Sequence, residues 1–271
     1  MDDPNRLPVP QVLNRIRRLR SRAVRQQTGL HFVEGFRSFL QSADSSIPID
    51  LLLYSEILAQ NPAVQMAVRR LKREGTPVVR VSPEQFRSVS ETPHASGIGA
   101  ILRQHWTPLD RIDPRRGLCW IAVRWLRSPG NLGTLLRTAE AVGAAGLILI
   151  GDAADPFDPA VVRASMGGLF HLQFSRAPLG AVAEWCRRHR CTVVGTSPSA
   201  DALYTEVPLE PPLVVMFGEE RAGLTPAEEA ICTHRAKIPM VGAADSLNIG
   251  VAAGIVLYEV FRRRVMDSSN F

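Results

Sequence analysis

Short apolar runs alternate with amphipathic segments along the second half of the chain, from Leu118 onward. Runs such as LCWIAV, GLILIG, CTVVGT and LVVMFG have the length of buried strands, and the segments between them carry apolar residues at helical spacing. Strands that alternate with helices in this way form a parallel sheet covered by helices on both faces. The pattern therefore predicts an α/β fold for residues 117–271.

A smaller α/β unit precedes this fold. Between residues 32 and 102 the pattern predicts a helix that begins in FVEGFRSFLQSA, strands in IDLLLY, VVRVS and GIGAIL, and helices in NPAVQMAVRRLKREG and SPEQFRSV. Residues 103–116 are rich in proline and charge, which is typical of a linker. The predicted organisation is an N-terminal domain over residues 1–102, a linker over 103–116 and a C-terminal domain over 117–271.

The segment from Ala236 to Arg263 places a polar loop between a short strand, 236–240, and a long helix, 247–263. Asp245 and Ser246 are residues typical of a helix cap, as are Ser82, Asp158 and Thr225 at three other predicted helix starts. We expect the apolar face of the long helix to carry Leu247, Val251, Ile255 and Tyr258. Small residues in its first turns indicate that another group approaches the backbone closely.

Composition limits the class of protein. Of the 271 residues, 45% are hydrophobic and 21% are charged, which is typical of a folded globular chain. The apolar runs are too short to span a bilayer and the N-terminus lacks a signal peptide, so we expect no membrane association and a cytoplasmic location. The four cysteines have no C-x2-C spacing, so no zinc site is predicted.

A net charge of +6 favours a polyanionic partner. The densest run of positive charge lies in a helix predicted over residues 11–27. Such a run is often only a solvated helix face, but here almost no acidic residues are interspersed, which favours contact with nucleic-acid phosphates. The candidate RNA-binding residues are Arg15, Arg17, Arg18, Arg20, Arg22 and Arg25.

The C-terminal domain contains three polar segments, in sequence order, that are candidates for binding a ligand. The first runs from Asn131 through Arg137 in NLGTLLRTA, the second is FGEERAGL from Phe217 to Leu224, and the third joins IPM to SLNIGVAAGI. Taken singly, each is also compatible with a purely structural role, as a helix start, a polar turn or a packed terminal helix. Loops that follow parallel strands are nevertheless where open α/β sheets bind ligands.

Together the three segments resemble the motifs of the SpoU (TrmH) family of RNA 2'-O-ribose methyltransferases, within the SPOUT class. The N-terminal stretch RRLRSRAVRQQTGLHFVEG also resembles the substrate-binding domain that precedes the catalytic domain in many SpoU enzymes. The resemblance implies a small ribosomal-protein-like N-terminal domain, a C-terminal SPOUT domain with a trefoil knot, the cofactor S-adenosylmethionine, an RNA substrate and a homodimer that pairs through the C-terminal helix.

The resemblance also implies site residues. Those matching the family's catalytic positions are Asn131, Arg137, Glu220, Ser246 and Asn248, and those expected to hold the cofactor are Thr196, Gly218, Ile238, Met240 and Leu247. Because a guanidinium stays protonated under ordinary conditions, we expect Arg137 to position a phosphate and stabilise the developing oxyanion. Gly250 is a departure, since the family commonly has serine at this position.

Three alternative functions remain open at this point. A Rossmann-type methyltransferase or dehydrogenase is disfavoured because GLILIGDAADPF offers no G-x-G-x-x-G turn. A non-catalytic RNA-binding protein on the same fold is the second alternative, and the retained polar residues of the three motifs count against it. Ribosomal RNA is the favoured substrate, with transfer RNA as the third alternative.

Overall fold

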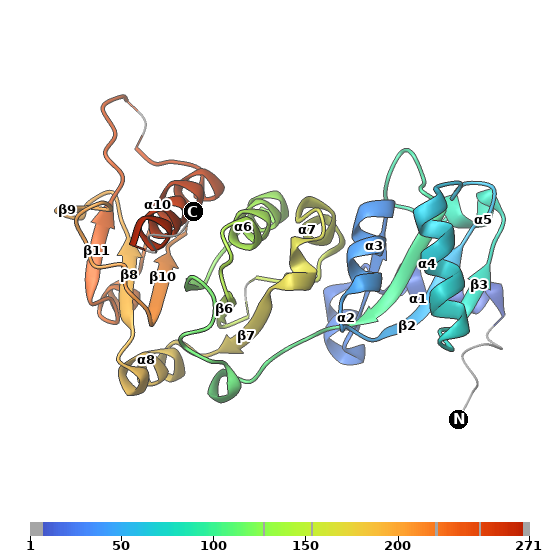
Figure 1. Cartoon of the computed structure of the whole chain (residues 1–271), viewed down its shortest axis with the longest axis horizontal. Coiled ribbons are helices and arrows are strands. Elements are labelled where there is room, and N and C mark those ends of the chain that lie inside the picture. The colour runs from blue at the N-terminus through green and yellow to red at the C-terminus, as the bar shows by residue number, and fades with distance from the viewer. Residues whose placement is uncertain (1–7, 127, 153, 220–221, 244, 268–271) are drawn as a thin grey trace. The chain divides into compact units, whose positions relative to one another are not determined.

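The computed structural model describes residues 8–126, 128–152, 154–219, 222–243 and 245–267. The chain forms two compact units (Figure 1). The first unit contains the chain as far as His105 together with Asp155–Phe170, and the second contains Trp106–Ala154 and the chain from His171 onward. The boundary at His105 falls inside the predicted linker. The inclusion of Asp155–Phe170 in the first unit departs from the division made on sequence, because this segment lies within the predicted C-terminal domain.

The first unit is built on a four-stranded mixed sheet with the order β1-β4-β2-β3. Its strands are β1 (Leu30–Glu34), β2 (Ile49–Tyr54), β3 (Val78–Arg80) and β4 (Ile98–Arg103). The central strand β4 is antiparallel to both β1 and β2, whereas β3 is parallel to β2 and lies at the edge. The N-terminal part of the chain therefore has the predicted α/β organisation.

Helices cover both faces of this sheet, as the alternation of side chains along β2 requires. Leu51 and Leu53 pack in a core with α1 (Val9–Arg18) and with Phe86 of α5 (Pro83–Arg87). The intervening side chains point to the opposite face, where Tyr54 meets α4 (Pro62–Arg73). Helix α3 (Phe36–Asp44) packs against α4 on that side.

Two elements of the first unit differ from the prediction. The single helix expected over residues 11–27 is two helices, α1 and α2 (Arg22–Thr28), separated by a turn at Leu19 to Ser21. The residues 32–34, expected to begin a helix, instead belong to β1, because they pair with β4 and the chain turns only at Gly35, where φ is 107°.

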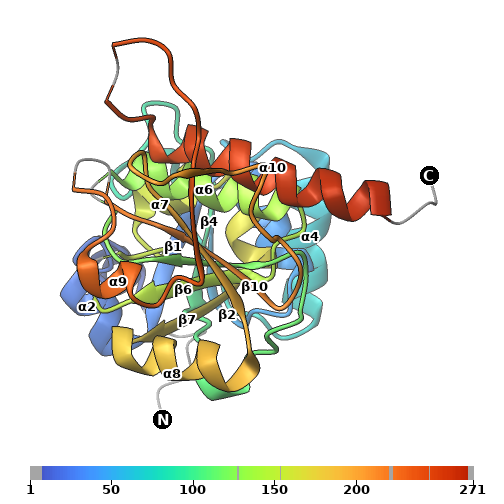
Figure 2. The ribbon, with the colours of Figure 1, turned by 90° about the vertical axis from the view of Figure 1, so that its left-hand side faces the viewer.

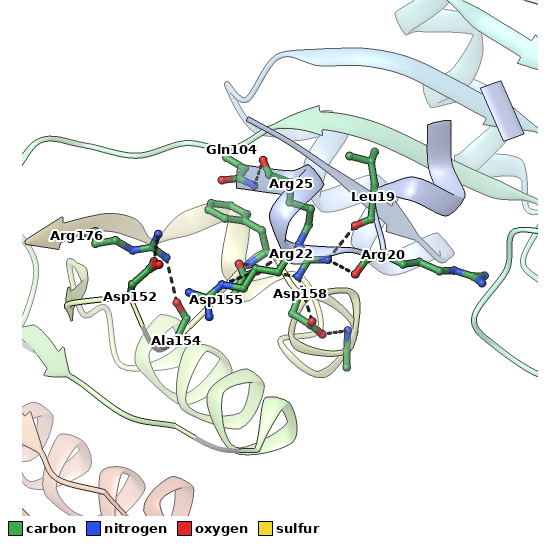
Figure 3. A network of polar contacts seen from close by, with 12 residues as sticks. Leu19, Arg20, Arg22, Arg25, Gln104, Asp152, Ala154, Asp155, Asp158 and Arg176 are labelled. Atoms are coloured by element: carbon green, nitrogen blue, oxygen red, sulfur yellow. Dashed lines mark hydrogen bonds and ion pairs between the residues drawn. The ribbon is translucent and has the colours of Figure 1, made fainter. Parts of the chain in front are cut away.

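The turn between α1 and α2 is stabilised by the buried guanidinium of Arg25, which is 1% exposed (Figure 3). Its Nη1 donates hydrogen bonds to the carbonyl oxygens of Leu19 and Arg20 at 2.9 and 2.7 Å, which satisfies acceptors that the end of α1 leaves free. Its Nη2 lies 2.7 Å from Asp155 and 3.2 Å from Asp158. A buried charge needs such partners, so Arg25 fastens the distant segment 155–158 to the first unit.

Aromatic contacts strengthen the same attachment. Phe157 is fully buried, and its ring centroid lies 4.8 Å from that of His31 and 5.3 Å from that of His105. Asp158 then caps the short helix α7 (Pro159–Ala164) by accepting a hydrogen bond from the amide of Ala160, as predicted. Burial, followed by the charges of His105 and Arg25, lowers the pKa of His31 to about 3.

The second unit contains a seven-stranded parallel sheet with the order β7-β6-β5-β10-β8-β11-β9. Its strands are β5 (Trp120–Val123), β6 (Gly146–Ile150), β7 (Gln173–Ala177), β8 (Thr192–Thr196), β9 (Ala202–Leu203), β10 (Leu213–Phe217) and β11 (His234–Lys237). The parallel sheet expected for the C-terminal domain is thereby confirmed. The trefoil knot stays a prediction.

Helices cover both faces of the parallel sheet (Figure 2). On one side α6 (Pro129–Ala141) and α10 (Ile249–Asp267) lie next to each other. On the other side α8 (Leu179–His189) buries Val182 and Trp185 in a core with Trp120 and Val214. The short helix α9 (Pro226–Glu229) begins with the predicted capping box of Thr225 and Glu228.

Ion pairing anchors the far end of α10 within the second unit. Glu259, whose side chain is 8% exposed, accepts hydrogen bonds from Arg262 and Arg263 at 2.8 Å, and these contacts lower its pKa to about 2. Arg263 also donates to the carbonyl oxygens of Val207 and Thr205. Across the described part of the chain, no helix has the length and apolar character needed to cross a membrane.

The lowered pKa of His31 predicts acid sensitivity. The folded protein binds fewer protons at this site than the unfolded chain, so the free energy of unfolding falls as the pH drops below the unfolded pKa of 6.5 and continues to fall toward a pH of about 3. The slope is about 1.4 kcal/mol per pH unit for one proton. Urea unfolding between these limits, followed by circular dichroism, should show a weaker pH dependence for His31→Phe. The exposed His94 supplies the control His94→Phe, which should retain the wild-type slope.

Candidate active site

A cavity of 370 Å³ lies beyond the carboxyl ends of strands β8, β10 and β11. Its wall includes the end of β10, the segment that follows β11 and the first residues of α10. Because these strands are parallel, their carboxyl ends meet at one edge of the sheet, which is where α/β proteins bind ligands. The second and third sequence motifs therefore meet at a single cavity.

All five residues predicted to hold the cofactor line this cavity. They are Thr196, Gly218, Ile238, Met240 and Leu247, and the predicted catalytic residue Ser246 lies among them. Sequence reasoning missed two carboxylates of the lining, Glu219 and Asp245. On sequence, Asp245 is predicted only as a helix cap, and the resemblance assigns the family's carboxylate to Glu220, the neighbour of Glu219. Glu220 lies outside the described residues.

The turn of the second motif depends on glycine at position 218. Glu219 and Gly223 exchange two backbone hydrogen bonds of 3.0 and 2.9 Å, which closes the turn directly after β10. A Cβ on Gly218 would overlap the backbone of Gly223 and Leu224. The close approach of these two backbone segments therefore excludes any larger residue at position 218 without displacement of the cavity wall.

The first and third motifs are joined by a hydrogen bond between two asparagines. Nδ2 of Asn248 donates to Oδ1 of Asn131, in the first turn of α6, at 2.9 Å. Oδ1 of Asn248 accepts from the backbone amide of Gly250 at 2.9 Å. The amide of Asn248 thus caps α10, which begins at Ile249, and the predicted cap at Asp245 and Ser246 is wrong because the chain becomes helical only beyond these residues.

The space between α6 and α10 also explains the departure at Gly250. A Cβ at this position would lie 2.9 Å from Cγ2 of Thr134 and 3.1 Å from Oδ1 of Asn248. Both distances are shorter than an ordinary contact, so Thr134 fills the volume in which a side chain at position 250 would begin. A larger residue here would press on the asparagine bridge.

Arg137 lies on α6 and its side chain is exposed. Among the described residues, its guanidinium makes no hydrogen bond or ion pair. An exposed arginine without an internal partner keeps all of its donors for an external anion, for which its planar fork is suited. Its predicted role toward the substrate stays a prediction.

The predicted RNA-binding arginines are mostly occupied by contacts within the first unit. Arg15 pairs with Asp50 at 2.7 Å, Arg17 donates to Ser88 at 2.8 Å, and Arg20 pairs with Glu91 at 2.8 Å. Arg22 lies 4.0 Å from Asp155 (Figure 3). The prediction is wrong for Arg25, because its guanidinium is buried against two carboxylates and is closed to solvent. Of the six, Arg18 alone has a side chain without a hydrogen bond or ion pair to any described residue.

Comparison with known proteins is consistent with this geometry. Residues 120–258 match the SpoU rRNA Methylase family, and residues 11–100 match the MRM3-like substrate binding domain. The chain is 33% identical over 254 residues to a 23S rRNA (uridine(2479)-2'-O)-methyltransferase of Streptomyces viridochromogenes. The matched region covers 91% of this chain and 88% of the relative. The chain belongs to the SpoU rRNA methylase family.

Solved structures extend the similarity over both units. An AdoMet-bound rRNA methyltransferase from Sinorhizobium meliloti superposes with a TM-score of 0.84 at 31% identity, covering 93% of this chain and 94% of the other. The SpoU methyltransferase AviRb from S. viridochromogenes, solved with AdoMet, gives a TM-score of 0.82 at 32% identity, with coverage of 94% and 98%. The predicted α/β fold with a C-terminal SPOUT methyltransferase domain is thus confirmed, apart from the trefoil knot, which stays a prediction.

The lining of the cavity fits S-adenosylmethionine. Phe217, Ile238, Met240 and Leu247 supply an apolar surface of the kind that an adenine ring requires. Glu219 and Asp245 supply carboxylates, which attract a positively charged sulfonium and its ammonium group. The cavity volume also falls within the range typical of sites for small cofactors.

Gly218→Ala is expected to weaken binding of S-adenosylmethionine by about tenfold or more, because the overpacked turn must move away from the cavity. Isothermal titration calorimetry measures the change, and a thermal melt shows whether the variant is folded. Gly242→Ala serves as the control, since a Cβ there meets no atom within 4 Å. Equal affinities for wild type and a folded Gly218→Ala variant would contradict the assignment of this cavity to the cofactor.

Proposed function

We propose that this protein methylates the 2'-hydroxyl of a ribose in ribosomal RNA, with S-adenosylmethionine as the methyl donor. The observation that supports this most directly is the convergence of the three motifs on one side of the parallel sheet, with the second and third lining one cavity and the first bonded to the third. The relatives named as 23S rRNA 2'-O-methyltransferases support the choice of ribosomal RNA over transfer RNA. We also propose that the enzyme is cytoplasmic, because ribosomes are assembled in the cytoplasm.

S-adenosylmethionine supplies a methyl group on a sulfonium, an electrophile that an oxygen attacks in line. The protein must then place the ribose and assist the loss of the hydroxyl proton as negative charge develops on O2'. We assign Arg137 to the phosphate next to this ribose and to the developing charge, because its guanidinium is exposed and makes no contact with the described residues. Asn131 and Asn248, fixed by their mutual hydrogen bond, orient the ribose.

Orientation of this kind carries much of the catalysis. Holding the two reacting groups in line supplies about 7–11 kcal/mol of the barrier in well-oriented systems. Ser246 lines the cofactor cavity and is exposed, which suits a contact with the incoming nucleotide. The transfer breaks the bond between the methyl group and sulfur, and the proton of the 2'-hydroxyl passes to solvent water, because the protonated guanidinium of Arg137 is a donor only.

Arg137→Ala should lower methyl transfer to unmodified 23S ribosomal RNA by about a hundredfold to a thousandfold, the effect of removing one stabiliser of a developing oxyanion. Affinity for S-adenosylmethionine should stay within about twofold, since Arg137 is not part of the cavity lining. Transfer of a radiolabelled methyl group and calorimetry measure the two quantities. Arg187→Ala, at an exposed arginine of α8, is the control for loss of one positive charge. Near wild-type turnover by Arg137→Ala would show that this arginine is not part of the active site.

We further propose that the enzyme is a homodimer that pairs through α10. One face of this helix buries Ala253, Val256 and Leu257 within the second unit. The opposite face leaves Val251, Tyr258 and Phe261 between 37% and 53% exposed. An apolar stripe of this kind on a long helix is costly in water and is typical of a protein interface.

Light scattering at micromolar concentration should give the mass of two chains for the wild type. Tyr258→Glu should shift the protein toward the monomer, because it places a charge in the centre of the exposed apolar stripe. Glu184→Gln on α8, an exposed change away from this stripe, should leave the mass unchanged. A monomeric wild-type protein would rule out the proposed pairing.

A further inference from the structure

A polar cleft of 280 Å³ lies in the first unit between α4 and the strands β2 and β3. Its charged lining consists of Glu56, Arg69, Lys72 and Arg80, and Tyr54 forms part of its wall. Figure 1 shows the three elements that border it. We call this feature the α4 cleft.

The local sequence explains why the cleft is open and why it is basic. Tyr54 and Arg80 share one face of the sheet because their neighbours Leu53 and Val79 point into the core beneath α1. Arg69 and Lys72 lie one turn apart along α4, beside the buried residues that pack this helix on the sheet. Since β3 is an edge strand, no strand within the described ranges closes this side.

The charges of the α4 cleft do not cancel internally. Glu56 lies 3.1 Å from Arg80 in an exposed pair, and no other described residue of the lining carries a carboxylate. Arg69 and Lys72 have exposed side chains that form neither a hydrogen bond nor an ion pair with any residue the structure describes. The dipole of α4 accounts for a cation in its last turn, such as Lys72, but not for Arg69 or for Arg80 on a strand.

We propose that the α4 cleft binds the phosphodiester backbone of the substrate RNA. Arg69 and Lys72, whose side chains pair with no described residue, offer several donors to phosphate oxygens. Tyr54 is only 6% exposed, so its ring is covered and does not stack on a base. The cleft therefore recognises the backbone and contributes affinity without reading sequence.

This inference rests on the proposed function and moves the RNA contact away from the arginines of α1, α2 and the turn between them. That segment carries more positive charge in the sequence, but most of its arginines are engaged by carboxylates, carbonyls or hydroxyls of the first unit. Cations that are already paired release fewer counterions when RNA binds. Arg69 and Lys72 retain their full charge for an external polyanion.

The test compares RNA affinity against salt concentration for the full-length protein, with unmodified 23S ribosomal RNA as the probe. Arg69→Ala/Lys72→Ala should reduce the slope of log affinity against log salt by about 1.4 to 1.8, since each lost phosphate contact contributes about 0.7 to 0.9. At an ionic strength of about 0.15 M the affinity should fall by about tenfold or more. Arg69→Lys/Lys72→Arg keeps both charges and should restore most of the slope.

The control variant is Arg187→Ala/Arg188→Ala, which removes two exposed charges from α8 in the other unit and should leave the slope within about 0.3 of wild type. Wild-type slope and affinity in Arg69→Ala/Lys72→Ala would overturn the inference. Inorganic phosphate forms a second arm. Saturable binding of phosphate at millimolar concentration that this variant abolishes, while its RNA affinity and salt slope stay at the wild-type values, would assign the cleft to a small anion and would also overturn the inference.

The same proteins test the cleft and the methyltransferase activity separately. If the wild type transfers methyl groups and Arg69→Ala/Lys72→Ala binds RNA as the wild type does, the proposed function is supported and the role of the cleft is contradicted. If RNA binding depends on the cleft but the wild type transfers no methyl group, the role of the cleft is supported and the proposed function is contradicted. Failure of the wild type to bind the RNA would overturn both.

Discussion

The hydrogen bond between Asn131 and Asn248 is the constraint on which the site depends. It joins residues that are 117 positions apart, one in the first turn of α6 and the other at the start of α10. Asn248 uses both ends of its amide, because it donates to Asn131 and accepts from the amide of Gly250. The side chain is therefore fixed in orientation, and the packing of α6 on α10 fixes where the loop before α10 enters the cavity.

Small residues around this bond are part of the same arrangement. Gly250 leaves room for Thr134 and for the amide of Asn248, and Gly218 allows the turn that ends at Gly223 to close directly after β10. A larger residue at either position would meet neighbouring atoms at less than an ordinary contact distance. At both glycines the backbone therefore approaches other groups closely. In α10 this close approach has a cost, because glycine at position 250 lowers the helix propensity of the segment.

Much of the fold could be predicted because its signals are local. The apolar runs gave the strands of the parallel sheet, and Ser82, Asp158 and Thr225 cap the helices that they were expected to cap. The five cofactor positions also met in one cavity, since they follow strands whose carboxyl ends share an edge of the sheet.

The errors arose where a partner is distant in the sequence. Arg25 resembles a solvated arginine until Asp155 and Asp158, 130 and 133 residues away, are placed beside it. The strand β1 resembled the start of a helix because its pairing with β4 is not visible locally. Along α10 the sequence showed an apolar stripe but not which stripe is buried. On the predicted face, Val251 and Tyr258 stay exposed, whereas Leu247 and Ile255 are half-buried.

The central claim is that this chain methylates ribose in ribosomal RNA, and site-resolved mapping of 2'-O-methylation tests it most directly. Ribosomal RNA from cells that carry the gene should contain a 2'-O-methylated nucleotide that is unmodified in RNA from cells lacking it, and the purified enzyme with S-adenosylmethionine should restore that modification. Identical ribose methylation of ribosomal RNA in the two cell lines, with no methyl transfer by the purified enzyme, would contradict the account.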